Sequence, residues 1–588
     1  MAPAGGEQVP QHPVNPYVLR LFGPKGPLSR PAPHYSVNMR RRLVFALVFF
    51  ALSVGDAGDV VAQVADETLV PRGRLRLQFN PSFTSWGQRF GEYSEAGTLT
   101  SGKEALGSDL TDEAGTGLFP AVADLESHLR ALSGNASYSG VLGATSGRVS
   151  QDVTRIDLGA QLGVFDWLTV GVVLPLVKTH TSVDVAVRQN GVASDLGLNP
   201  AVSDASAVAS FLNALSTLSA SASAQAGTLC AVDPASVACS DAQSLADRVN
   251  AFHASSEGAY LASAFFPLEG SAIAQSLSDV ATALDGDLSE AGLGGIGGTM
   301  LFATDLLSEE SLADAPTTNG FGIQGSRLEG LNTHWALGDV EVSALAHILD
   351  GEVRDSGAVA PGMSYSLAGG LMVRLGTGSV DQQDVFLDLG TGDGQMDIEA
   401  RLLAFVGLGP RLGVHVAARY GMQQSLDLLR RVAPPELVMA PAHTVRAVRW
   451  SPGAYLGIDL APQWRLSPTL SILGSYGLYA KGDDSYQMLG DDPEGSPPAD
   501  VGDLERESGV TVHRAGLGLR YSTVEPWRAG ETSRPLEMQL RAVYSIAGSG
   551  GHTPVATRIE FGIRLFRGIW GGSPAVATAS DTSLGAGR

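Results

Sequence analysis

The chain has 588 residues, of which 17% are charged and 44% hydrophobic, and its formal net charge is −22. This composition is too hydrophobic for a disordered chain, and the acidic balance argues against nucleic acid as a partner. No run of about 20 apolar residues occurs that could form a membrane-spanning helix, so the sequence also excludes a helical membrane protein.

The first organised segment has the features of an export signal. Three consecutive arginines precede an apolar run from Leu43 to Val54, and small residues follow it. This pattern predicts a signal peptide at 39–65, with cleavage after Ala62 or Ala65. Residues 1–38, which are Pro-rich and featureless, are then expected to be a gene-start artefact.

The mature chain is predicted to begin with a strand and a long loop. Apolar and polar residues alternate in Arg72–Phe83, which predicts the strand. Gly, Ser and Asp are frequent from Trp86 to Ser150, where only a short helical pattern occurs, around Leu118–Leu132. We expect this stretch to be a long loop.

The clearest β pattern lies between Gln151 and Val187. Apolar residues alternate with polar or small ones from Ile156 to Val164, Phe165-Asp166-Trp167 makes a tight reversal, and a second strand starts at Leu168. Each arm reaches the roughly 9 to 11 residues that a tilted strand needs to cross a bilayer. This hairpin therefore predicts a transmembrane β-barrel.

A different pattern interrupts the strands at 189–332. The segment is rich in Ala and Ser, and apolar residues such as Val208, Phe211 and Leu215 have helical spacing. Two or three amphipathic helices are predicted, as an extracellular insert that caps or plugs the barrel. The sequence GLGGIGG at 292–298 satisfies a dinucleotide-binding motif but follows a helical stretch, which favours a flexible hinge. Cys230 and Cys239, the only cysteines, are predicted to form a local disulfide.

Alternation returns at Thr333 and continues almost to the end of the chain. With the earlier strands, it predicts an all-β fold: a transmembrane antiparallel up-and-down β-barrel of about 12 strands (12–14) over residues 66–566, followed by a C-terminal tail at 567–588. The further predicted strands are Thr333–Leu349, Met363–Leu375, Asp397–Leu408, Leu412–Tyr420, Val445–Leu460, Arg465–Ala480, Thr511–Tyr521, Leu536–Ile546 and Val555–Leu565.

The connections between these strands support a barrel in the outer membrane. Short and long links alternate, as expected for short periplasmic turns and longer external loops, and both termini are then periplasmic. The predicted periplasmic turns include Ala461–Trp464, and three tryptophans at such turns, Trp167, Trp464 and Trp527, would form an aromatic girdle. The acidic link Lys481–Val510 is expected to be a solvated external loop.

One face of the predicted strands is apolar and the other is charged. An arginine that faces lipid at the midplane costs roughly 2–4 kcal/mol, so the charged face should line the lumen. Arginine outnumbers carboxylate there, and two interpretations stay open: a cationic wall that favours anions, or lateral salt-bridge ladders that hold a narrow barrel together. The predicted lumen-lining residues are Arg155, Asp157, Glu341, His347, Arg374, Glu399, Arg401, Arg411, His415, Arg419, Arg449, Arg465, Arg514, Arg541, Glu560 and Arg564.

Three short motifs resemble a known family. They are Gly163–Leu168 followed by Leu174-Pro175-Leu176, Leu337–Val342 with its Gly-Asp pair, and Leu389–Gly392. They are similar to motifs of the bacterial outer-membrane transporters of the meta-pathway phenol-degradation family. The resemblance covers 151–187 and 333–480 and implies a porin-like barrel that passes small hydrophobic or aromatic compounds. The long helical insert departs from the family pattern.

The sequence thus predicts an outer-membrane channel for small solutes, either anionic or aromatic and hydrophobic. Its expected partners are outer-membrane lipid, the solute and the barrel-assembly machinery; no cofactor, metal or nucleic acid is expected, and the oligomeric state is open. One alternative is a lipase-like barrel enzyme, but the strand histidines His347, His415 and His513 accompany no G-x-S-x-G or H-E-x-x-H motif. Another is a structural or adhesive barrel whose helical insert binds a partner.

Overall fold

The computed structural model describes most of the chain after the predicted signal peptide. The predicted artefact and signal peptide, and the predicted tail from 571 onward, lie outside the described residues. These are 69–90, 102–111, 114–119, 121–188, 194–308, 331–332, 334–353, 362–383, 385, 387–434, 440, 444–492, 498–506, 508–532, 534–551 and 553–570.

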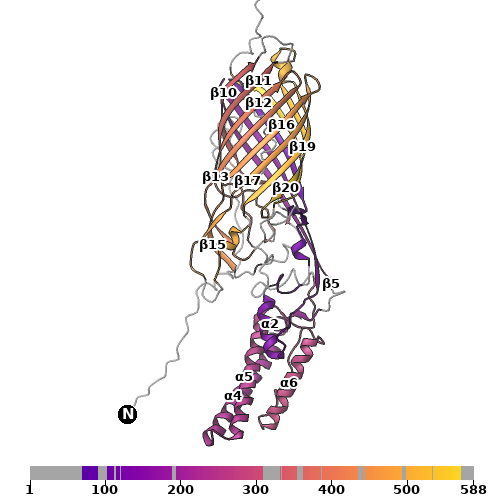
Figure 1. Cartoon of the computed structure of the whole chain (residues 1–588), viewed down its shortest axis with the longest axis vertical. Coiled ribbons are helices and arrows are strands. Elements are labelled where there is room, and N and C mark those ends of the chain that lie inside the picture. Colours follow the sequence, from indigo (N-terminus) through magenta and orange to yellow (C-terminus); the bar gives the residue numbers. More distant parts are fainter. Residues whose placement is uncertain are drawn as a thin grey trace, which may run out of the picture. The chain divides into compact units, whose positions relative to one another are not determined.

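Twelve antiparallel strands form a closed barrel, which confirms the predicted fold class (Figure 1). Neighbours in sequence pair in order, and the barrel closes where β5 pairs with β10. The barrel strands are β1 (Arg74–Trp86), β4 (Ala144–Phe165), β5 (Leu168–Arg188), β10 (Glu341–Val353), β11 (Met363–Arg374), β12 (Asp397–Leu408), β13 (Leu412–Gln423), β16 (Tyr455–Arg465), β17 (Leu470–Lys481), β19 (Val510–Ser522), β20 (Leu536–Ser549) and β21 (Thr557–Gly568).

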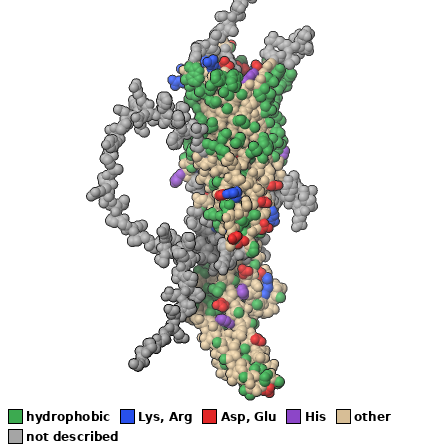
Figure 2. Space-filling model, turned by 90° about the vertical axis from the view of Figure 1, so that its left-hand side faces the viewer, with side chains coloured by type: hydrophobic (Ala, Val, Ile, Leu, Met, Phe, Trp, Pro, Cys, Tyr) green, Lys and Arg blue, Asp and Glu red, His purple; other side chains and the backbone are tan. Residues whose placement is uncertain are grey.

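The period-two alternation decides which side chains face outward. In β12, Asp397, Glu399 and Arg401 are buried, whereas Ile398 and Leu402 are exposed. The other barrel strands present apolar side chains outward in the same way, and Figure 2 shows hydrophobic side chains gathered over the strands. An apolar exterior around a charged interior is the polarity of a barrel whose outer face meets lipid.

Short and long connections alternate as predicted. Turns at Asp166–Trp167, Gly409–Arg411 and Leu466–Thr469, and the short helix α9 (Val524–Arg528), join strands at one end, here called the turn end. At the other end, the loop end, the connections are mostly long, and one of them contains the helical insert. The last connection there, between β20 and β21, is short.

Several predicted boundaries are wrong. The barrel strand β10 begins at Glu341, not at Thr333 as predicted. β4 already begins at Ala144, so part of the predicted long loop is strand. The predicted strand Val445–Leu460 is broken, because Pro452 cannot donate a backbone hydrogen bond and the chain turns before β16 begins. As a result the predicted turn Ala461–Trp464 lies inside β16, and the real turn follows Arg465.

The first half of that broken strand lies outside the barrel sheet. β15 (Val445–Ser451) pairs instead with β14 (Leu426–Arg431) and β18 (Ser485–Met488) in a small three-stranded sheet. Both connections that supply these strands are loop-end connections. The long links after β13 and β17 therefore have structure of their own.

The insert contains helices, as predicted. They are α3 (Pro200–Ser203), α4 (Ala205–Val232), α5 (Val237–Ala262) and α6 (Ala272–Glu290). The three longer helices are capped by Asp204, Ser236 and Ser271, whose side chains accept backbone N–H bonds from the first turn. A disulfide joins Cys230 at the end of α4 to Cys239 in α5. Among the described residues, none of the helices is long and apolar enough to cross a membrane.

The helices share one hydrophobic core with α2 (Ala121–Ser133), the helix between β1 and β4. Leu215, Val249 and Leu277 are fully buried in it. The barrel strands contribute Val149, Val183 and Val185 as buried members, and Val187 packs against this core; all four belong to the part of the β4–β5 hairpin that extends beyond the end of β1. The helical region therefore has a core of its own, attached to the barrel through that hairpin.

Candidate functional site: the barrel interior

A network of buried ion pairs surrounds Arg374 in the barrel interior. Its guanidinium lies 3.0 Å from Asp397, 3.7 Å from Glu399 and 3.8 Å from Glu341, and its side chain is 1% exposed. Arg401 pairs with Glu399 as well, and the Tyr455 hydroxyl donates a 2.8 Å hydrogen bond to the same carboxylate. These contacts hold several buried charges away from bulk water.

A second network lies on β19, β20 and β21. Arg541 and Arg558 both pair with Glu560, at 2.8 and 2.9 Å, and Arg520 and Arg564 both approach Glu537. On neighbouring strands between the two networks, Arg419 pairs with Asp459. All of these side chains are 12% exposed or less.

The strand register explains why these pairs form. Arg374 is directly opposite both Glu341 and Asp397, and Arg541 is directly opposite Glu560. Opposite charges at facing positions of an antiparallel pair attract, and burial strengthens the attraction. The interior is therefore polar and, at the level of these networks, filled by side chains. This arrangement matches the salt-bridge ladder interpretation.

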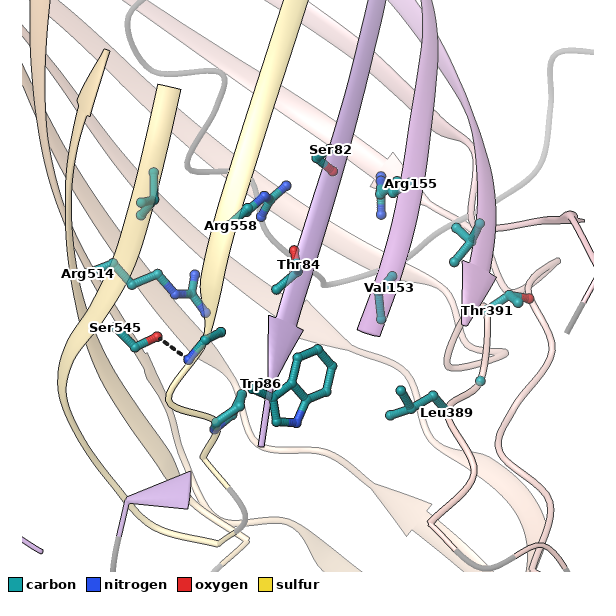
Figure 3. Close-up of a pocket in the computed structure, with 15 residues that line it drawn as sticks. Ser82, Thr84, Trp86, Val153, Arg155, Leu389, Thr391, Arg514, Ser545 and Arg558 are labelled. Carbon is teal, nitrogen blue, oxygen red and sulfur yellow. Dashed lines mark hydrogen bonds between the residues drawn. The ribbon is translucent and has the colours of Figure 1, made fainter. Parts of the chain in front are cut away.

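Nearer the loop end lies a cavity of about 200 Å³ (Figure 3). Three arginines from three strands line it, Arg155 of β4, Arg514 of β19 and Arg558 of β21, together with Trp86 at the end of β1. No carboxylate occurs among the residues that line it. They are Ser82, Thr84, Trp86, Val153, Arg155, Val177, Leu389, Gly390, Thr391, Arg514, Val543, Ser545, Pro554, Ala556 and Arg558.

The cavity combines positive charge with an apolar surface. Arg155 pairs with Asp157 at 2.7 Å and approaches Glu341 at 3.5 Å, and Arg558 pairs with Glu560. The carboxylates thus stand behind the arginines, outside the cavity lining, so the cavity itself is lined by guanidinium groups and by valine, leucine and tryptophan side chains. Such a surface suits a small solute that carries a negative charge and an apolar part.

The wall of the cavity at Leu389–Thr391 belongs to the long connection between β11 and β12, here called the β11–β12 loop (375–396). Its Leu387 carbonyl accepts 3.0 Å hydrogen bonds from Gln151 and Thr181. Its Leu389 carbonyl accepts a 3.1 Å bond from Thr179. Because these three donors are buried side chains of β4 and β5, the loop lies against the inner side of the barrel wall.

The base of the β11–β12 loop is fixed by Asp339, which is fully buried before β10. Its carboxylate accepts backbone hydrogen bonds from Gly378 and Asp393. Gly392 passes so close that a Cβ there would lie 2.0 Å from the Asp339 carboxylate, so glycine is required. Burial, and then the negative charge of Asp397, raise the pKa of the Asp393 carboxyl to about 6.

The same loop is also attached to the small sheet at the loop end. Arg430 of β14 makes a two-pronged pair with Asp381, at 2.7 and 2.9 Å, and Arg431 donates to the Gln383 carbonyl at 2.9 Å. Bidentate arginine–carboxylate pairs restrict geometry more than single hydrogen bonds do. The loop is thus anchored from two sides.

Most of the predicted lumen residues lie on the inner side of barrel strands. His415 packs against Phe405 with 4.6 Å between ring centres, and His347 lies near the turn end, 3.2 Å from Asp350. The inward group comprises Arg155, Asp157, Glu341, His347, Arg374, Glu399, Arg401, His415, Arg419, Arg514, Arg541, Glu560 and Arg564. Their role as solute contacts stays a prediction.

Three predicted residues lie elsewhere. The assignment of Arg411 and Arg449 to the lumen is wrong: Arg411 is exposed in the turn before β13, and Arg449 is exposed on β15, where it pairs with Asp427. Arg449 follows the same alternation as a barrel residue, but its strand belongs to the small sheet. Arg465 ends β16 at the turn-end rim, where it pairs with Glu525 at 2.8 Å.

Sequence reasoning missed several interior residues, of which Arg76, Tyr455 and Trp86 are examples. Arg76 is 1% exposed and contacts Gln161, Tyr455 joins the Arg374 network, and Trp86 donates a 3.0 Å hydrogen bond to Gln151. The alternation of Arg76 with Leu75 and Leu77 was a signal that could have identified it. Trp86 lies at the boundary of a strand and a long loop, where no periodicity marks its direction.

The strand histidines His347, His415 and His513 lie on three different strands and do not meet in one site. His513 lies 2.8 Å from the hydroxyl of Tyr476, an exposed residue of the outer face, and His347 and His415 come from different strands. In the part of the chain that the structure describes, no three potential metal ligands cluster. At the turn end, Trp167 and Trp464 are exposed, and Trp527 stacks under Arg74 at 4.9 Å.

Comparisons with known proteins find similarity in structure only. No protein-family model matches the sequence, and no curated protein matches it. The chain is similar to an outer-membrane channel from Pseudomonas putida F1, with a TM-score of 0.36, 8% identity, and coverage of 85% of this chain and 98% of that one.

Two other solved structures show comparable similarity. One is a FadL homologue from Pseudomonas aeruginosa, with a TM-score of 0.23, 6% identity, and coverage of 84% and 90%. The other is the Pseudomonas putida toluene transporter TodX, with a TM-score of 0.21, 10% identity, and coverage of 85% and 90%. Similarities at these values carry no information about the solute or the mechanism.

Proposed function

We propose that the chain is an outer-membrane channel for small solutes and that it prefers anions with an apolar part. The observation that carries the proposal is the cavity inside the closed barrel, which three arginines line without any carboxylate. A positively charged surface with low-dielectric walls concentrates anions at the entrance of a pore. The apolar outer face of the strands supports a place in the outer membrane.

The ion-pair networks limit how wide such a channel is. Several interior side chains of the barrel are almost completely buried, as Arg76, Arg374 and Arg541 illustrate with 1 to 2% exposure. A wide, water-filled pore is therefore not expected. A solute would pass in single file, and the conductance would be small.

Ion selectivity in planar bilayers tests the proposal. With a potassium chloride gradient across the membrane, we expect a small conductance whose reversal potential shows that chloride passes more readily than potassium. Arg514→Gln should reduce this preference, because it removes a positive charge from the cavity. The matched control is Arg449→Gln, which removes an exposed arginine of the small sheet and should leave the selectivity unchanged. A preference for potassium would disprove the anion pathway.

A second candidate is a barrel that conducts nothing and serves as a membrane anchor for the helical region. The buried Arg374 and Glu560 networks favour it, since they fill much of the interior. The same bilayer experiment separates the two candidates. A protein that has folded, as heat-modifiable gel migration would show, and that nevertheless gives no conductance would support the anchor.

A further inference from the structure

We infer that Leu387–Thr391, here called the constriction segment, is an adjustable constriction at the cavity, and that Thr179, Thr181 and Gln151 set how large a solute can enter the cavity. The inference rests on the proposed channel function. It assigns a size-determining role to three polar residues that carry no charge and that line the wall behind the segment.

The position of the constriction segment supports this role. Leu389, Gly390 and Thr391 line the cavity directly, and Figure 3 shows Leu389 and Thr391 across the cavity from Arg514. Gln151 on β4, and Thr179 and Thr181 on β5, hold the segment. They lie on the same face of these strands as Val153 and Val177, two residues that line the cavity. The segment therefore lies between the barrel wall and the space that a solute would occupy.

The attachments of the segment are weaker than those of the rest of the loop. The hydrogen bonds that tie it to the wall are neutral: the Leu387 and Leu389 carbonyls accept from Gln151, Thr179 and Thr181. The Thr391 hydroxyl donates a 3.2 Å bond to the Leu337 carbonyl, which is also neutral. The flanking parts of the loop are held by Asp339 and by the Asp381–Arg430 pair, which are charge-assisted contacts. Charge-assisted hydrogen bonds are roughly twice as strong as neutral ones, so the middle of the loop can shift while its base stays in place.

Backbone conformation supplies an independent observation. Leu387 has a φ of +53°, and in the described part of the chain every other residue with a positive φ is a glycine. A leucine in this region is strained and stays there only when its surroundings hold it. The carbonyl of this same residue accepts the hydrogen bonds from Gln151 and Thr181 that hold the segment to the wall. Removal of those bonds should therefore let the segment relax.

Solute size exclusion tests the inference. We would insert the double variant Thr179→Val and Thr181→Val into planar bilayers and measure conductance in the presence of neutral polyethylene glycols of graded mass. Valine keeps the shape of threonine but cannot donate, so we expect a higher conductance and a shift of the cut-off toward larger polymers. Thr154→Val is the matched control, since Thr154 lies between the cavity-lining Val153 and Arg155 on β4, on the opposite face of the strand, and should leave the cut-off unchanged.

A reversible cross-link gives the opposite perturbation. With Thr181→Cys and Leu387→Cys in one chain, a disulfide would fix the segment to the wall. While the disulfide is intact, we expect the polymer-size cut-off to be at or below that of the unmodified protein. After a reducing agent breaks the disulfide, we expect larger polymers to enter. The unmodified protein under the same reducing agent controls for reduction of Cys230–Cys239.

The outcomes distinguish this inference from the channel function on which it rests. If the unmodified protein conducts and the Thr179/Thr181 double variant has the same cut-off as the Thr154→Val control, the constriction lies elsewhere and the inference is wrong, while the channel stands. If the unmodified protein does not conduct at all, both are wrong. Gel migration of each variant before and after heating shows whether the barrel has folded.

Discussion

The barrel and the helical region bury opposite kinds of side chain. The helices enclose a large apolar core that includes Leu215, Val249 and Phe266. Among the described residues of the barrel, an apolar cluster has only Leu403, Ala417 and Ala461 as buried members, and the interior contains many buried arginines and carboxylates. The difference follows from the surroundings, because strands that turn their apolar side chains to lipid have only their polar side chains left for the interior.

This contrast implies that the two regions are stabilised by different interactions. Removing a methyl group costs stability where side chains are packed without water, as in the helical core. Removing a charge costs stability where a buried partner is left without compensation, as in the barrel. Three predictions test the contrast, from the largest expected effect to the smallest.

The largest loss is expected from Glu399→Ala. This substitution leaves Arg374 and Arg401 without the carboxylate that both approach, at a site with almost no solvent access. Breaking a buried pair from one side costs about 3–5 kcal/mol. Denaturant unfolding of the protein in lipid vesicles would measure the loss. Ile398→Ala, on the outer face of the same strand, is the control and should cost much less; equal losses would show that pairing is not what stabilises the barrel.

Leu215→Ala probes the apolar core. Leu215 is fully buried between the helices, and truncation of such a leucine costs about 2–5 kcal/mol. We expect the helical circular dichroism signal at about 222 nm to melt at a lower temperature, while the heat-modifiable gel migration of the barrel stays the same. Val232→Ala, at an 84% exposed position of α4, should change neither. A simultaneous loss of barrel structure would contradict the separate-core description.

The smallest effect is expected from pH, at the base of the β11–β12 loop. The pKa of the Asp393 carboxyl is raised from 3.8 to about 6, so the protonated form is favoured in the fold. Its contribution to stability is fully present below the unfolded pKa and is lost as pH rises through about 6. Amide exchange of the loop, corrected for intrinsic rates, should therefore show less protection at pH 7.5 than at pH 5. Asp393→Asn should remove this difference.

Much of the fold could be predicted from the sequence because strand alternation is a local pattern. The hairpin at Gln151–Val187 and the charged face of β12 both follow from period two. The helical insert followed from its apolar spacing. What could not be predicted is which sheet a strand joins: Arg419 and Arg449 have equivalent patterns, yet one lies inside the barrel and the other on an exposed sheet.

The inward position of the β11–β12 loop was beyond sequence reasoning for a different reason. It depends on hydrogen bonds to the backbone carbonyls of Leu387 and Leu389. Every residue has the same backbone carbonyl, whatever its side chain. No residue pattern therefore marks the contact. The donors Gln151, Thr179 and Thr181 look like ordinary inward-facing strand residues until the loop is placed beside them.

The extended β4–β5 hairpin has a consequence for how the barrel is assembled. The two strands that close the barrel, β5 and β10, are separated in sequence by the whole segment between Arg188 and Glu341. They pair over a short stretch, Leu168–Val173 of β5 with Glu341–Ala346 of β10. Bringing distant strands together costs loop entropy. Helices that fold on the projecting hairpin shorten the free chain between β5 and β10, so the helical region would act as an intramolecular aid to closing the barrel seam.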